Sequence, residues 1–150
     1  MNSDLLVVGY GNTLRHDDGV GPRVAEAVEA LHLDGVRTLA CPQLTPELAD
    51  PLSRAGTAIF VDASVDGQRR ISLRRLDPSD SSQILAHAAD PCTLLALARD
   101  AFGRAPDAWM LEVPAEEIGF GERLSPKAER GLREAVRGVR RLHWRLRDRR

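Results

Sequence analysis

The protein has 150 residues, of which 43% are hydrophobic and 29% are charged, a composition that excludes wholesale disorder and fits one domain with an ample core. Its formal net charge is −1, but the charge is unevenly distributed. Residues 140–150 hold six arginines and one aspartate, so residues 1–139 carry 15 basic against 21 acidic groups, a net charge of −6. Aromatic residues make up only 4%, which argues against a base-stacking surface for single-stranded nucleic acid.

The compartment is indicated by the N-terminus and the cysteines. The first six residues lack the charged and apolar regions of a secretion signal, and no stretch approaches the roughly 18 consecutive apolar residues of a membrane span. Cys41 and Cys92 lie far apart in the chain and fit no metal-binding Cys-x-x-Cys pattern, so we expect two reduced thiols. We therefore expect a cytoplasmic protein without a membrane partner.

The first half of the chain predicts strands and helices in alternation. Leu5–Val8 is a short apolar run that stops at a glycine, which is typical of a strand buried on both faces of a parallel sheet. From Val20 the apolar residues recur at helical spacing, and a second strand is predicted at Val36–Cys41. Thr45 is then expected to cap a helix over Pro46–Arg54.

The second half continues the alternation. The predicted elements are a strand Thr57–Val61, an edge strand Ile71–Leu76, a helix Cys92–Phe102 opened by Pro91, a strand Ala108–Val113 and a final helix capped by Ser125. This order predicts an α/β fold: a three-layer sandwich with a mainly parallel twisted sheet and helices on both faces. We expect a single domain over residues 1–150 with a basic end at 140–150.

The segment after the first strand contains glycines that at first suggest a dinucleotide site. Gly9-Tyr10-Gly11 begins the pattern, but Leu14 stands where the third glycine is required. Asp17 and Asp18 follow, and two negative charges at a helix N-terminus compete with phosphate for the positive end of the helix dipole. A pyrophosphate site is therefore disfavoured, and the chain has neither a Walker A motif nor a Gly-x-Ser-x-Gly nucleophile motif.

Acidic residues at the expected carboxyl ends of strands are the first candidates for a site, because ligands of parallel sheets bind there. Asp17 and Asp18 either cap the helix that begins near Val20 or face a ligand, and four flanking glycines allow another backbone to approach closely. Asp62 ends a buried apolar strand, where a charge must be hydrogen-bonded, paired or coordinated. It is either a turn carboxylate or a ligand.

His87 supplies a possible nitrogen donor before the helix that Pro91 opens, although a lone histidine is more often a solvated or core residue. If Asp18, Asp62 and His87 meet at one sheet edge, their two oxygens and one nitrogen suit zinc or nickel and leave coordination positions open. The other histidines have no better individual claim to a metal; they are His16, His32 and His143. Whether the three side chains meet is a question for the tertiary structure.

The segment from Gly9 to Gly21 resembles the [NiFe] hydrogenase maturation protease family, endopeptidases that trim the C-terminal extension from the hydrogenase large subunit. The shared pattern is an apolar strand, Gly-x-Gly-Asn, a short gap, two acidic residues and Gly-x-Gly. The resemblance continues through Gln43–Leu48, Asp62-Ala63, His87 and Gly121–Pro126, so it covers almost the whole chain except the arginine-rich end.

The resemblance implies site residues, a metal and a partner. By motif, the family's metal-binding residues fall on Asp18, Asp62 and His87, and Asp17 is a candidate for orienting a ligand or water. The implied metal is nickel supplied with the substrate, which another divalent metal can replace, and the implied partner is a hydrogenase large-subunit precursor. Two features depart from the family pattern: Asp18 is one methylene shorter than the Glu of well-known members, and the segment around His87 differs. Cys92 is the nearest substitute ligand.

The resemblance thus implies a metal-dependent peptidase whose metal activates water, polarises the scissile carbonyl or only docks the substrate. No Ser-His-Asp or Cys-His arrangement is suggested, which argues against a covalent acyl-enzyme.

The residues are also compatible with two other classes of function. One is a non-catalytic metal- or peptide-binding maturation module that has lost cleavage, although all three candidate ligands are retained. The other is a nucleic-acid binder that uses the arginines of residues 140–150. The simpler interpretation of these arginines is a solvated helix end whose cations suit the helix dipole, so we expect no nucleic-acid partner.

Overall fold

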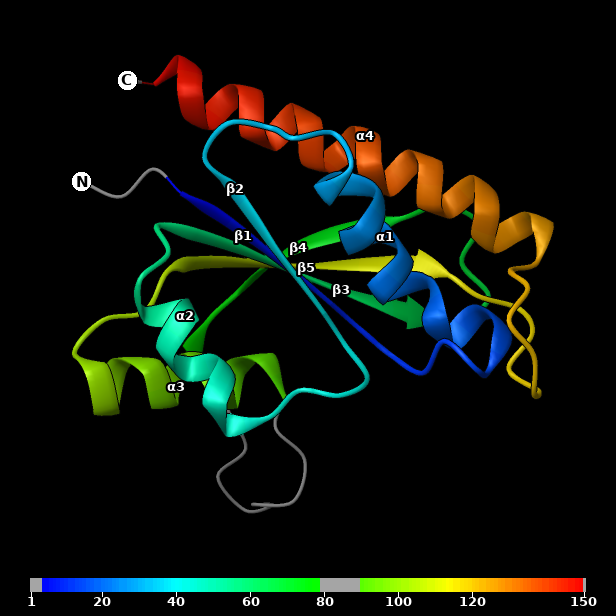
Figure 1. The fold of residues 1–150 in the computed structure, drawn as a ribbon, viewed down its shortest axis with the longest axis horizontal. Helices are drawn as coiled ribbons and strands as arrows, with labels where there is room; N and C mark the ends of the chain where they lie inside the picture. Colours follow the sequence, from blue (N-terminus) through cyan, green and yellow to red (C-terminus); the bar gives the residue numbers. More distant parts are fainter. Residues whose placement is uncertain (1–3, 79–89, 150) are drawn as a thin grey trace.

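Five strands form one sheet in the computed structural model, which describes residues 4–78 and 90–149 (Figure 1). The order across the sheet is β2-β1-β3-β5-β4. The strands are β1 (Leu5–Tyr10), β2 (Val36–Cys41), β3 (Thr57–Ser64), β4 (Ser72–Leu76) and β5 (Asp107–Pro114). All neighbours pair in parallel except β4, which runs antiparallel along the edge beside β5. The predicted mainly parallel sheet and the edge position of the fourth strand are confirmed.

Helices cover both faces of this sheet, which confirms the three-layer prediction. The helices α1 (Val20–Glu29) and α4 (Pro126–Asp148) lie on one face, and α2 (Ala49–Ser53) and α3 (Pro91–Phe102) lie on the other (Figure 1). Successive residues of β1 enter opposite cores because side chains alternate along a strand. Leu5 and Val7 therefore pack under α1 and α4, and Leu6 and Val8 pack under α2 and α3.

The two later helices begin where the sequence predicts. Each has proline at its first position, where the missing N–H costs no hydrogen bond. The carboxylate of Asp90 accepts a hydrogen bond from the Thr93 N–H at 2.7 Å, and the hydroxyl of Ser125 accepts one from the Ala128 N–H at 3.1 Å. These caps satisfy amide groups that the first helical turn leaves free.

The helix expected over residues 46–54 is shorter than predicted. A 3-10 turn, η2 (Pro46–Leu48), precedes the five-residue α2. Thr45 makes no capping hydrogen bond to the backbone, so the prediction of a cap there is wrong. Its hydroxyl instead donates to the Glu47 carboxylate at 2.7 Å.

The chain reverses its direction across the sheet between β1 and β3. From β1 the chain passes through α1 to β2 on one side, and all later strands lie on the other side of β1. In open α/β sheets the ligand crevice lies beyond the carboxyl ends of the strands at such a reversal. The fold therefore directs attention to the segments that follow β1 and β3.

Helix α1 packs onto this reversal through a glycine. A Cβ atom on Gly21 would lie 2.5 Å from the carbonyl oxygens of both Tyr10 and Val61, and neither backbone atom can rotate away. We expect Gly21→Ala to lower the free energy of unfolding by about 2–3 kcal/mol. Gly138→Ala in α4, where the nearest atom is a methyl of Ile71 at 3.6 Å, should raise it by about 0.5–1 kcal/mol. Urea unfolding curves measure both, and changes of the same sign would contradict this packing.

The basic end of the chain lies on α4. Its described arginines are exposed to solvent: Arg140, Arg141, Arg145, Arg147 and Arg149. The guanidinium of Arg147 forms a long ion pair of 3.5 Å with the carboxylate of Asp34. This exposure is what a solvated helix end requires. Within residues 4–78 and 90–149, no helix combines the length and apolarity needed to cross a membrane.

Candidate functional site

The two adjacent acidic residues lie in a 3-10 turn, η1 (His16–Gly19), between β1 and α1. The residue that precedes α1 is Gly19, and no side chain caps that helix, so the interpretation of Asp17 and Asp18 as its caps is wrong. The carboxylate of Asp18 instead accepts a hydrogen bond from the Asn12 N–H at 2.9 Å. This bond holds Asp18 beside the end of β1.

The glycines around this turn have a structural explanation. A Cβ atom on Gly9 would overlap the carbonyl oxygen of Gly21, and one on Gly11 would overlap that of Asp18. The backbone that approaches these glycines is therefore the chain's own, which lets η1 and α1 pack directly on β1. Their presence does not point to a ligand.

Asp17 is fully buried, and its carboxylate binds the loop that follows β5. It accepts hydrogen bonds from the N–H groups of Glu116 at 2.7 Å, Glu117 at 3.0 Å and Ser125 at 2.7 Å, and from the Ser125 hydroxyl at 2.6 Å. Burial by itself raises the pKa of Asp17, but the hydrogen bonds from Ser125, Glu117 and Glu116 outweigh burial, so the pKa is lowered. Asp17 thus fastens the loop 115–125 to η1 and holds its neighbour Asp18 in place.

Asp62 lies within β3, not at its end, because the strand continues to Ser64. It lies two residues after Phe60 and so projects from the sheet face that α2 and α3 cover. Its carboxylate accepts a hydrogen bond from the Ala63 N–H at 2.8 Å and one from the Tyr10 hydroxyl. Glu112 lies opposite Asp62 on the neighbouring β5.

The carboxylate of Asp62 has an unusual pKa. The pKa of Asp62 is raised to about 6, chiefly by burial and also by the charges of Asp18 and Glu112, against the two hydrogen bonds that the carboxylate accepts. Burial and the charge of Asp62 likewise raise the pKa of Tyr10. Glu112 has a cationic neighbour, Arg74, at 3.7 Å.

The described residues provide no ion pair for either Asp18 or Asp62. Two carboxylates within electrostatic reach of each other and without a counter-charge fit a divalent cation, for which carboxylate oxygens are suitable ligands.

The raised pKa of Asp62 predicts that the free energy of unfolding depends on pH. The native carboxyl of Asp62 binds its proton more tightly than the unfolded chain does, so between about pH 4 and 6 the native state holds more protons and stability falls as the pH rises. Asp62→Asn has no such proton. The free energy of unfolding of the variant, taken relative to that of the parent, should therefore increase by about 1–2 kcal/mol between pH 4 and pH 8. Urea unfolding at both pH values checks this, with the exposed loop residue Asp66→Asn as control. A stability difference that is the same at both pH values would contradict it.

Comparison with known proteins assigns the fold. No family model matches the chain, and no curated protein matches its sequence. Solved structures do match: the hydrogenase maturating endopeptidase HybD from E. coli superposes with a TM-score of 0.75 at 25% identity, over 91% of this chain and 89% of that one. The protein has the fold of the [NiFe] hydrogenase maturation proteases. The resemblance seen in the sequence is confirmed at this level.

Two archaeal structures give the same result for the maturation-protease fold. A hydrogenase 2 maturation peptidase from Thaumarchaeota archaeon SCGC_AB-539-E09 has 25% identity and a TM-score of 0.66, covering 91% of this chain and 95% of that one. The [NiFe] hydrogenase maturation protease HycI from Thermococcus kodakarensis KOD1 has 20% identity and a TM-score of 0.72, covering 97% and 93%. This chain therefore spans nearly the full length of each.

The third predicted ligand of this maturation-protease fold, His87, lies outside the described residues. Asp90, three residues later, caps α3, and its negative charge contributes to the raised pKa of Tyr10. The beginning of α3 is therefore within electrostatic reach of the Tyr10–Asp62 pair. Cys92, the substitute ligand, is partly buried and packs against the core under α2 and α3.

The rings of two of the remaining histidines have other partners. The ring of His16 hydrogen-bonds the Arg123 carbonyl at 2.9 Å, and that of His143 hydrogen-bonds the Asp34 carbonyl at 2.6 Å. Within the part of the chain that the structure describes, no group of three or more His, Cys, Asp or Glu side chains is arranged to hold a metal. Asp18 and Asp62 are brought within electrostatic reach of each other, and the complete ligand set stays a prediction.

Sequence analysis missed two neighbours of Asp62 in this maturation-protease fold, Tyr10 and Glu112. Glu112 carried a signal, since it is a charged residue inside an apolar run predicted to be a buried strand. Tyr10 stands between two glycines of the family pattern, and the pattern itself assigns no role to the residue between them. Its hydroxyl could not be assigned to Asp62 before β1 and β3 were known to be neighbours.

Proposed function

We propose that the chain is an endopeptidase that removes the C-terminal extension of a [NiFe] hydrogenase large-subunit precursor after nickel insertion. Asp18, Asp62 and His87 are the residues that recognise the bound metal. The observation that carries the proposal is the pair Asp18 and Asp62, within electrostatic reach of each other and without an ion pair among the described residues, at the sheet reversal of this fold. The similarity to hydrogenase maturation endopeptidases supports the choice of substrate.

The proposed ligands suit a metal that arrives with the substrate. Two carboxylates and one imidazole leave coordination positions open, so they hold a metal best when the substrate's own groups already bind it. Cleavage then depends on correct nickel insertion. The reaction adds one water across a peptide bond and releases the extension, with a new carboxylate on the mature subunit. Another divalent ion can replace nickel if it keeps the same coordination.

His87 enters the proposal from its sequence position and from Asp90. The cap of α3 lies within electrostatic reach of Tyr10, and only two residues separate His87 from that cap. His87 is therefore proposed from its place in the family motif, three residues before that cap.

The test is a mass measurement of the large-subunit precursor, co-expressed with and without this protein and with and without nickel. We expect the precursor to lose the mass of its extension only when both are present. A nickel-loaded precursor that binds the protein and keeps its full mass would assign a non-catalytic maturation module instead. Cleavage that proceeds equally without nickel would overturn the recognition of the metal.

A further inference from the structure

Two loops at the carboxyl edge of the sheet expose large apolar side chains. Leu14, in the loop after β1, is 58% exposed, and Phe120, in the loop after β5, is 93% exposed. The Gly121 N–H donates a hydrogen bond to the Leu14 carbonyl at 2.8 Å, so the two loops lie side by side. We call Leu14 and Phe120 the apolar rim.

The apolar rim lies next to Asp18. The side-chain oxygen of Asn12 accepts a hydrogen bond from the Leu14 N–H at 2.9 Å, and the Asn12 N–H donates to the Asp18 carboxylate at 2.9 Å. One asparagine thus connects the rim to the proposed metal-recognition site. Leu14 and Asp18 therefore share Asn12 as a hydrogen-bond partner.

The exposure of the rim does not come from a loosely held loop. Asp17 accepts four hydrogen bonds from the loop that carries Phe120, and the His16 N–H donates to the Gly121 carbonyl at 2.6 Å. The His16 ring occupies the space that a Cβ atom on Gly121 would need. A rigid backbone therefore presents Phe120 to solvent, and such preorganisation lowers the entropic cost of binding.

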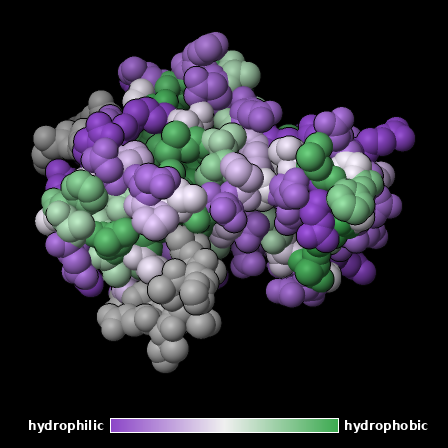
Figure 2. All heavy atoms as spheres, turned by 60° about the horizontal axis from the view of Figure 1, so that its bottom comes forward, coloured by the Kyte–Doolittle hydropathy of each residue, from purple (hydrophilic) through white to green (hydrophobic). Residues whose placement is uncertain are grey.

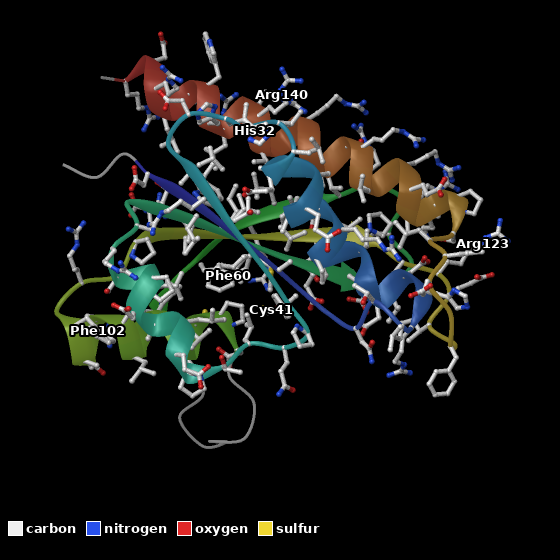
Figure 3. The ribbon with its side chains drawn as sticks, in the orientation of Figure 1. His32, Cys41, Phe60, Phe102, Arg123 and Arg140 are labelled. Atoms are coloured by element: carbon white, nitrogen blue, oxygen red, sulfur yellow. The ribbon has the colours of Figure 1, made fainter. Side chains whose placement is uncertain are left out.

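Another exposed phenylalanine lies far from the rim. Figure 2 shows hydrophobic side chains among hydrophilic ones at the right-hand end of the molecule, the end that carries the loop after β5 in Figure 1. Phe102, an exposed phenylalanine at the end of α3, lies at the opposite end from Arg123 of that loop (Figure 3). Phe102 therefore provides a matched control of the same residue type.

We propose that the apolar rim docks an apolar side chain of the substrate polypeptide, next to the segment that carries the metal. The inference rests on the proposed function, because the occupant is the hydrogenase large-subunit precursor. Aromatic side chains on a rigid support are frequent binding hot spots. The rim adds affinity for the polypeptide to the metal contacts of the acidic pair.

The test measures initial rates of cleavage against the concentration of nickel-loaded precursor, together with precursor binding by calorimetry. We expect Phe120→Ala and Leu14→Ala each to raise KM and Kd about tenfold, with kcat within about twofold of the parent. Phe120→Leu should restore most of the affinity, because it keeps an apolar side chain. Phe102→Ala should leave KM, kcat and Kd unchanged.

The outcomes separate this inference from the proposed function. A parent protein that binds the precursor without cleaving it overturns the peptidase, and the Kd values of the variants still test the rim. Equal Kd values for the parent and Phe120→Ala overturn the rim whether or not cleavage occurs. A precursor that the parent neither binds nor cleaves overturns both. Because both rim side chains are exposed, unchanged thermal unfolding confirms that the variants are folded.

Discussion

Asp17→Ala is expected to lower the free energy of unfolding by about 3–5 kcal/mol, the largest effect on stability among the substitutions considered. The substitution removes a buried carboxylate and leaves the N–H groups of Glu116, Glu117 and Ser125 without their acceptor. Asp17→Asn should cost less, about 1–3 kcal/mol, because its amide oxygen can keep most of these bonds while its NH₂ faces one donor. Urea unfolding at pH 7 measures both.

The same residue predicts a loss of stability in acid. The native carboxyl of Asp17 has a lowered pKa, so its contribution is present above the unfolded pKa of about 4 and is lost as the pH falls through its native pKa. The gap in stability between the parent and Asp17→Asn should therefore narrow below pH 4. A gap independent of pH would show that Asp17 does not act as a carboxylate.

Glu116→Ala is the matched control for Asp17. The substitution removes an exposed carboxylate from the loop 115–125 but keeps the backbone N–H that donates a hydrogen bond to Asp17. We expect a change within about 0.5 kcal/mol. Hydrogen exchange of the amides of Glu116, Glu117 and Ser125 should rise in Asp17→Asn and stay unchanged in Glu116→Ala. Faster exchange in both variants would contradict the role of Asp17 as the anchor of this loop.

The largest effect on activity is expected for Asp18→Ala, Asp62→Ala and His87→Ala, each of which should reduce precursor processing by at least about a hundredfold while the fold stays intact. Each removes one proposed ligand of the nickel that the precursor carries. Processing is followed by the mass of the nickel-loaded precursor, and folding is followed by thermal unfolding. Asp66→Ala, an exposed carboxylate after β3, should process normally.

Two further variants assign the ligands individually. Asp18→Glu should retain activity, because the resembling family places a glutamate at this motif position and the carboxylate is kept. Normal processing by His87→Ala together with loss in Cys92→Ala would transfer the third ligand to the cysteine. Normal processing by Asp62→Ala would contradict the proposed site, since the remaining carboxylate could not recognise the metal alone.

Local sequence patterns predicted most of the elements for reasons that act within a few residues. Pro91 and Pro126 at the first position of a helix, next to a capping Asp90 or Ser125, need only their own turn to be satisfied. Thr45 precedes Pro46 in the same way but makes no capping hydrogen bond, and its hydroxyl donates to the Glu47 carboxylate. Asp62 was expected at the end of a strand that in fact continues to Ser64. The continuation pairs with β5, and sequence spacing does not reveal that neighbour.

By itself, the sequence determined the alternation of strands and helices, a mainly parallel sheet with an edge strand, and the two carboxylates Asp18 and Asp62 as candidate ligands. Only the tertiary structure decided the partners of those carboxylates. It placed β1 beside β3, which brings Tyr10 to Asp62. It also placed the carboxylate of Asp17 where it accepts hydrogen bonds from a loop about one hundred residues away. The physical reason is that hydrophobic periodicity and capping are local, whereas hydrogen bonds and charge interactions between distant segments exist only after the sheet has assembled.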